Sequence, residues 1–161
     1  MDSNRYRLVS VWQLPAPRHG VYQALRDVPE YPLWWPQVRE VRRLDDRTGR
    51  LRIRSALPYQ LLVTVRERRQ DEAAGVLEAE LAGDLVGWSR WTVDPDGPAA
   101  SRAVFEQEVR PGKPLMRWLA LPGRPLFLAN HALMMRAGER GLRRRLLGSP
   151  AAASVSSGSG P

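Results

Sequence analysis

The chain has 161 residues, of which 43% are hydrophobic and 26% are charged, a composition typical of one globular domain with a hydrophobic core. It contains no cysteine, which excludes disulfides and thiolate chemistry, and no apolar run approaches the roughly 18 residues that cross a bilayer. The net charge of +8 comes from arginines spread along the chain, whereas a nucleic-acid surface more often clusters basic residues with exposed aromatics. This argues against a nucleic-acid partner. A cytoplasmic location is the expectation, because the first residues lack a secretory signal pattern.

The first predicted elements are a strand over residues 5–14 and a helix over residues 17–27. Prolines follow the strand and end it, because proline cannot donate to a sheet ladder. A segment with three prolines, residues 29–36, comes after the helix and leaves room for only a turn or a short helix. Its adjacent Trp34 and Trp35 must therefore bury much of their area against other elements.

From residue 38 onward the hydrophobic pattern changes to a period of two, which predicts strands. The clearest segment alternates Leu51 and Ile53 with arginines, so that one face is dry and the other is wet. Short turns separate consecutive segments, so an antiparallel meander is expected. The six predicted strands cover residues 38–44, 50–57, 59–69, 76–82, 87–93 and 101–109.

The last predicted element is one long helix over residues 126–147, with Pro125 near its start and Gly148 as its stop. Residues 149–161 are rich in Ser, Gly, Ala and Pro and are expected to form a disordered tail, which leaves residues 1–148 as a single domain. The α+β order of elements predicts a curved antiparallel sheet covered by the long helix. A concave apolar space between sheet and helix is where a small ligand would bind.

Four local motifs accompany this order of elements: Tyr31–Val38, Gly87–Trp91, Ser101–Phe105 and Asn130–Gly138. With them, about residues 5–147 resemble the START/Bet v 1-like superfamily, also called the SRPBCC or helix-grip fold, and within it the polyketide cyclase/dehydrase and lipid-transport families. The resemblance implies a seven-stranded curved antiparallel sheet wrapped around the long C-terminal helix, with two short helices after the first strand. Members carry lipids, sterols, quinones, hormones and polyketides, and only some are enzymes, so the fold alone does not choose a function.

The long helix carries the candidate catalytic residues. On a helical wheel with Phe127 at zero, His131 falls near 40°, Met134 near 340° and Gly138 near 20°, all within the apolar stripe, and Asn130 lies on its flank. In one interpretation, His131 and Asn130 face the cavity and bind a ligand oxygen or move a proton. In the other, His131 is a buried side chain bonded to a neighbouring strand. Gly138 makes the helix locally thin, with room for a ligand or for a close aromatic ring.

The sheet carries the remaining candidate ligand-binding residues. By alignment with the family, Ser89 and Trp91 of one strand and Phe105 and Gln107 of the next face inward. Ser89 or Gln107 could orient a ligand carbonyl or hydroxyl, or they could bond to each other or to His131. A slip of one residue in the register would reverse these faces.

The resemblance also implies that the segment of Trp34 and Trp35 helps to form the cavity entrance. The alternative is that both rings close the open end of the sheet as core. We expect one ring in the core and the other near the mouth. No metal or other cofactor is expected, because two histidines without cysteine do not make a zinc site and no Gly-rich phosphate loop is present. Arg143–Arg145 at the helix end interact favourably with the helix dipole, although they could also touch an anionic membrane.

Three functions are open at this point. The first is binding or transfer of a small hydrophobic or aromatic molecule, lipid- or polyketide-like, by a monomer or homodimer. The second is a polyketide cyclase, aromatase or dehydratase that acts on a ligand in the same cavity, with His131 or Asn130 assisting enolisation or water loss. The third is an interaction protein whose cavity is incidental.

Overall fold

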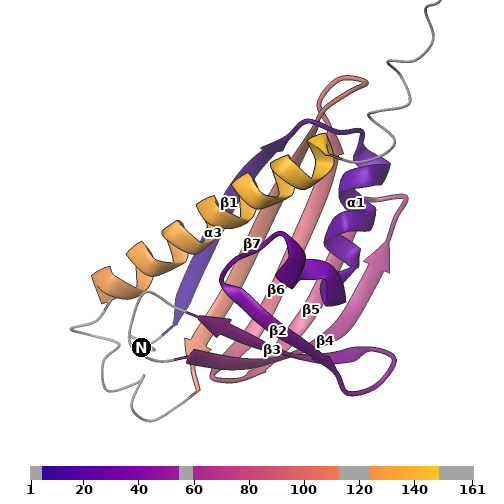
Figure 1. Cartoon of the computed structure of the whole chain (residues 1–161). Coiled ribbons are helices and arrows are strands. Elements are labelled where there is room, and N and C mark those ends of the chain that lie inside the picture. Colours follow the sequence, from indigo (N-terminus) through magenta and orange to yellow (C-terminus); the bar gives the residue numbers. More distant parts are fainter. Residues whose placement is uncertain (1–4, 55–59, 113–123, 149–161) are drawn as a thin grey trace, which may run out of the picture.

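The computed structural model describes residues 5–54, 60–112 and 124–148. In Figure 1 a strongly bent sheet curves around the long C-terminal helix α3, and the shorter helix α1 lies beside the C-terminal end of α3. The predicted ends of strands at residues 55–59 and the predicted tail at residues 149–161 fall outside the described residues. The strands are β1 (Tyr6–Leu14), β2 (Val38–Arg43), β3 (Thr48–Arg54), β4 (Gln60–Asp71), β5 (Val76–Gly83), β6 (Leu85–Pro95) and β7 (Ser101–Pro111), and the helices are α1 (Arg18–Arg26), η1 (Val28–Leu33) and α3 (Arg124–Leu147).

The strands form one seven-stranded antiparallel sheet in the order β1-β7-β6-β5-β4-β3-β2. Strands β2 to β7 are a meander, and the first strand closes it by pairing with the last. The chain therefore crosses from one edge of the sheet to the other between β1 and β2, and α1 and η1 make that crossing. This arrangement confirms the helix-grip fold that the sequence predicts.

Helix α1 packs on the sheet through buried Val21, Tyr22 and Leu25. Pro15 directly follows Leu14, the last residue of β1 to pair with β7, and Pro17 precedes the first turn of α1, where a missing N–H costs nothing. The Arg18 guanidinium fastens the helix start by donating to the backbone oxygens of residues 72, 73 and 93, at 2.8, 2.7 and 3.0 Å. One end of the sheet is thereby closed.

The second half of α3 lies against a cluster of indole rings. Its buried positions are Met135, Gly138 and Leu142. A Cβ on Gly138 would lie 2.6 Å from a ring atom of Trp35 and 2.8 Å from one of Trp12, so only a glycine lets the helix approach this closely. The ring N–H of Trp35 also donates to the backbone oxygen of Met134 at 3.0 Å. These contacts set the height of the helix above the sheet.

Ion pairs cover the convex face of the sheet. Glu78 of β5 accepts two hydrogen bonds from Arg90 of β6, at 3.0 and 2.5 Å, and Arg90 lies over the ring of Trp88. Arg5 and Arg7 of β1 pair with Glu108 and Glu106 of β7. The alternation of charged and apolar residues thus separates a charged outer face from an apolar inner one.

Candidate functional site

A cavity of about 670 Å³ lies between the concave face of the sheet, the α1–η1 segment and the first half of α3. Its volume is in the range of sites for drug-sized molecules. The strands contribute alternate, inward-facing side chains, so that the walls are mainly apolar. These include Val38, Leu51, Ile53, Leu61, Val63, Leu81, Trp91 and Phe105.

At one end of the cavity a polar pair joins α3 to the sheet. Nε2 of His131 lies 3.2 Å from Oε1 of Gln107 on β7. The amide oxygen can only accept, so the contact requires the tautomer in which Nε2 carries the proton, and in that tautomer Nδ1 presents a lone pair. Ser89 stands opposite Gln107 in the β6–β7 ladder, and Asn130 also lines this part of the cavity. The cavity therefore offers donors and an acceptor beside one another.

Burial keeps the His131 imidazole neutral. Removal from water lowers the pKa of His131 from 6.5 to about 4, because an apolar site disfavours the charged form. The amide of Gln107 carries no charge, and its residue is only 8% exposed. A ligand at this end meets neutral hydrogen-bonding groups and no fixed charge from this pair.

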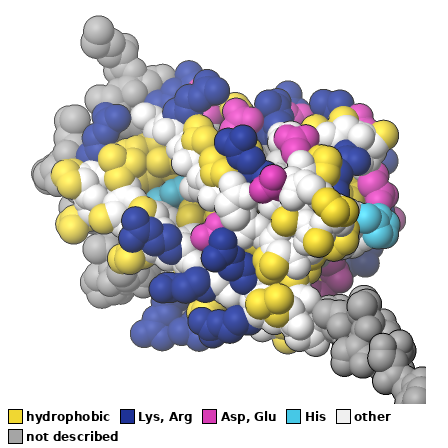
Figure 2. All heavy atoms as spheres, turned by 90° about the horizontal axis from the view of Figure 1, so that it is seen from above, with side chains coloured by type: hydrophobic (Ala, Val, Ile, Leu, Met, Phe, Trp, Pro, Cys, Tyr) yellow, Lys and Arg dark blue, Asp and Glu magenta, His cyan; other side chains and the backbone are white. Residues whose placement is uncertain are grey.

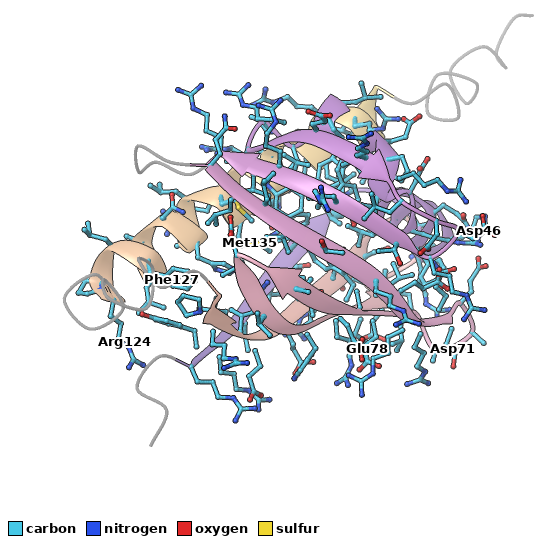
Figure 3. All side chains as sticks on the ribbon, turned by 90° about the horizontal axis from the view of Figure 1, so that it is seen from below. Asp46, Asp71, Glu78, Arg124, Phe127 and Met135 are labelled. Atoms are coloured by element: carbon cyan, nitrogen blue, oxygen red, sulfur yellow. The ribbon has the colours of Figure 1, made fainter. Side chains whose placement is uncertain are left out.

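The opposite end of the cavity is charged. Arg26 and Asp27 at the end of α1, Asp46 and Arg47 in the β2–β3 turn and Glu67 of β4 all line it. Figure 3 shows Asp46 and Phe127, which also lines the cavity, at opposite ends of the molecule. Cations and carboxylates are mixed here, so this end can hold a solvated or ionised part of a ligand.

Trp34 and Trp35 differ from the expectation that one ring lies near a mouth. Both are buried, at 5% and 4% exposure, and their rings stack 5.3 Å apart. Only Trp35 lines the cavity, whereas Trp34 packs edge-on against Trp12 behind it. The reason is that η1 lies so close to α3 that a Cβ on Gly141 would meet the backbone oxygen of Trp34.

Gly138 also lies behind the wall of the cavity and is not among the residues that line it. Of the two roles expected for it, the structure shows the close aromatic contact, with Trp12 and Trp35. Gly138 and Trp34 therefore pack behind the wall of the cavity and do not line it. The other predicted residues line a single cavity: Trp35, Ser89, Trp91, Phe105, Gln107, Phe127, Asn130, His131 and Met134.

Sequence reasoning missed the charged end of the cavity. Residues such as Asp27, Asp46 and Arg47 follow a helix or a strand and read as ordinary turn residues, with no periodicity that places them near the site. Within the described ranges, no three His, Asp or Glu side chains gather as a metal site would require. No helix in those ranges is long and apolar enough to cross a membrane.

Comparisons with known proteins agree with this architecture. The Zhui aromatase/cyclase from Streptomyces sp. R1128 has a TM-score of 0.77 and 16% identity, with 91% of this chain and 98% of that chain covered. A START superfamily protein from Mycobacterium smegmatis has a TM-score of 0.68 and 16% identity, with 87% and 96% covered. The di-domain ARO/CYC BexL from the BE-7585A biosynthetic pathway has a TM-score of 0.66 and 17% identity, with 90% and 48% covered.

Identities this low show the fold alone, and no curated protein matches the sequence. The match to a family model is more specific, because it covers residues 14–133 and so runs from the end of β1 into the first half of α3. The chain belongs to the polyketide cyclase/dehydrase and lipid transport family.

Proposed function

We propose that the protein binds, and carries in its cavity, a small hydrophobic or aromatic molecule that has at least one neutral oxygen. The main support for this proposal is a cavity of about 670 Å³ with apolar walls and the His131–Gln107 pair at one end. A ligand carbonyl would accept from the amide N–H groups of Gln107, and a ligand hydroxyl would donate to Nδ1 of His131. A cavity of this volume argues against the third function, an interaction protein whose cavity is incidental.

The alternative function is cyclisation, aromatisation or dehydration of a polyketide-like chain held in the same cavity. Two observations favour it: His131 offers an unprotonated ring nitrogen beside Asn130, and the similar Zhui and BexL proteins are an aromatase/cyclase and an ARO/CYC. Against it stands the pKa of His131, about 4, since a general base works best with a pKa near the operating pH. Binding is therefore the leading proposal.

Matched ligands test the binding proposal. Tryptophan fluorescence reports binding, because Trp35 and Trp91 line the cavity, and 2-naphthol and naphthalene differ only in the hydroxyl. We expect the protein to prefer 2-naphthol. Replacing Gln107 with leucine, or His131 with leucine, should reduce that preference by about ten-fold, the equivalent of one hydrogen bond of about 1–1.5 kcal/mol.

A pair of hydroxyl deletions on the same strand provides the control. Ser89→Ala removes a hydroxyl that faces the cavity, whereas Thr92→Val removes one from the opposite face of β6. Thr92→Val should leave both affinities unchanged. The proposal fails if neither aromatic binds, or if the preference for 2-naphthol survives the loss of both His131 and Gln107.

The enzyme alternative needs a separate measurement. A polyketide-like substrate would be incubated with the intact protein and its His131→Leu variant, with folding confirmed by circular dichroism. Product that requires His131 would favour catalysis over transfer. A cytoplasmic location and a monomeric or homodimeric state stay predictions from the sequence.

A further inference from the structure

The outward face of α3 has two distinct halves. In the first half Leu126 and Leu133 are 59% and 54% exposed. In the second half Arg136, Arg140 and Arg144 are exposed. Spacings of three, four and seven residues place all five on one face of the helix, away from the buried Met135, Gly138 and Leu142. A hydrophobic patch thus continues directly into a basic one.

Among the described residues, few acidic side chains lie near this basic half. Helix α3 contains six arginines and a single acidic residue, Glu139, whose carboxylate accepts from the backbone N–H of Gln13 at 3.0 Å. Arg143 donates to the backbone oxygen of Gln13, and Arg145 pairs with Glu30. The other three arginines of the second half have no ion pair with any residue in the described ranges. Figure 2 shows hydrophobic and basic side chains gathered side by side on the face that includes this helix.

The helix dipole explains part of this pattern and leaves part unexplained. Arginines near a helix C-terminus are favourable in any protein, but the dipole gives no reason for exposed leucines about one and three turns before them. Leucines beside basic residues on one helix face are typical of an interfacial helix. Such a helix buries its apolar side chains at the headgroup boundary of the membrane, and its basic residues attract anionic lipids. Single-stranded nucleic acid would instead favour exposed aromatic rings among the arginines, and this face of α3 has none.

We propose that α3 docks on an anionic lipid bilayer, with Leu126 and Leu133 in the headgroup region and Arg136, Arg140 and Arg144 against lipid phosphates. The inner face of the same helix lines the cavity through Phe127, His131 and Met134. Docking would place one wall of the cavity at the membrane surface. Vesicle binding is measured without any cavity ligand, so its outcome is independent of the ligand proposal.

Co-sedimentation of the full chain with vesicles tests this proposal. We expect binding to vesicles of phosphatidylcholine and phosphatidylglycerol in equal parts, weaker binding at high salt, and little binding to phosphatidylcholine alone. Removing three charges from the patch (Arg136→Gln, Arg140→Gln, Arg144→Gln) should weaken binding roughly a hundred-fold, since each surface arginine contributes about five-fold. The matched control removes three exposed arginines from the sheet, Arg39, Arg50 and Arg102, and should change binding much less.

Leucine variants distinguish insertion of apolar side chains into the membrane from attraction by charge alone. Leu126→Ser with Leu133→Ser should weaken binding, whereas Val9→Ser, at an equally exposed position on β1, should not. All variants should retain the circular dichroism spectrum of the wild type. The proposal is overturned if the two arginine sets weaken binding equally or if the leucines make no difference. It is also overturned if the protein binds single-stranded DNA through the α3 arginines and does not bind anionic vesicles.

Discussion

Replacing Gly138 with alanine tests whether the closeness of α3 to the tryptophans sets the shape of the cavity. The added Cβ would lie 2.6 Å from Cε2 of Trp35 and 2.8 Å from Cη2 of Trp12. Both rings are buried, at 4% and 2% exposure, and Trp35 is held by its hydrogen bond to Met134, so neither ring can swing away. The helix must shift outward, or the rings must leave their preferred rotamers.

The magnitude follows from two opposing effects. Alanine is favoured over glycine inside a helix by about 1 kcal/mol, and overpacking a well-filled core costs typically about 1–3 kcal/mol. Two contacts below 3.0 Å with rigid rings place the cost at the upper end of that range. We expect Gly138→Ala to lower the free energy of unfolding by about 1–2 kcal/mol, or the melting temperature by roughly 2–8 °C for a domain of this size.

Gly20→Ala is the matched control. Gly20 lies inside α1, and a Cβ there would have no atom within 4 Å. This variant gains the helix propensity without the clash and should be more stable by up to about 1 kcal/mol. Urea unfolding followed by circular dichroism measures both variants without relying on tryptophan emission, which the substitution itself changes. If Gly138→Ala proves as stable as Gly20→Ala, the packing argument is wrong.

Three further variants probe the site and its supports. The pKa of His131 is lowered to about 4, so between pH 6.5 and 4 the unfolded chain binds a proton that the folded chain does not. The free energy of unfolding should therefore fall as the pH falls through that window, by up to about 3 kcal/mol. In urea titrations, His131→Leu should lack this part of the pH dependence. Tyr31→Phe removes a buried hydrogen bond to the backbone oxygen of Leu25 and should cost about 1–2 kcal/mol of unfolding free energy. Ala79→Leu adds an apolar side chain inside the cavity and should raise the melting temperature while weakening the binding of 2-naphthol. If this variant keeps full affinity for 2-naphthol, the ligand binds elsewhere.

The sequence predicts the elements well because most of them carry a clear period. In β3, Leu51 and Ile53 alternate with arginines and face the core. The boundaries are less predictable, since strands end where their ladder partners end. Strand β6 begins at Leu85, two residues before its predicted start, because Leu85 pairs with Pro111. Strand β3 likewise begins at Thr48, inside the predicted turn, because Thr48 pairs with Arg66.

The candidate site is predictable as a set of faces but not as a set of contacts. The helical wheel places His131 on the inner face, and strand alternation does the same for Gln107, yet their 3.2 Å contact depends on the height of α3 above the sheet. No local pattern encodes that height. For the same reason the sequence does not distinguish Trp35, which faces the cavity, from its neighbour Trp34, which packs behind it.

Aromatic supports near the start of α3 and just past its middle explain why a cavity remains between them. At the start of the helix, the ring of Phe127 rests on Tyr6 with centroids 4.3 Å apart. Further along, Gly138 rests on Trp12 and Trp35. Between these supports the helix spans the bent sheet, and the side chains there do not reach far enough to fill the space. The volume of the cavity therefore depends on residues that hold the helix in place, two of which, Phe127 and Trp35, also line it. Its hydrogen-bonding chemistry depends on a different set, headed by His131. The polar lining residues can therefore be replaced to suit another ligand while the aromatic supports keep the cavity open.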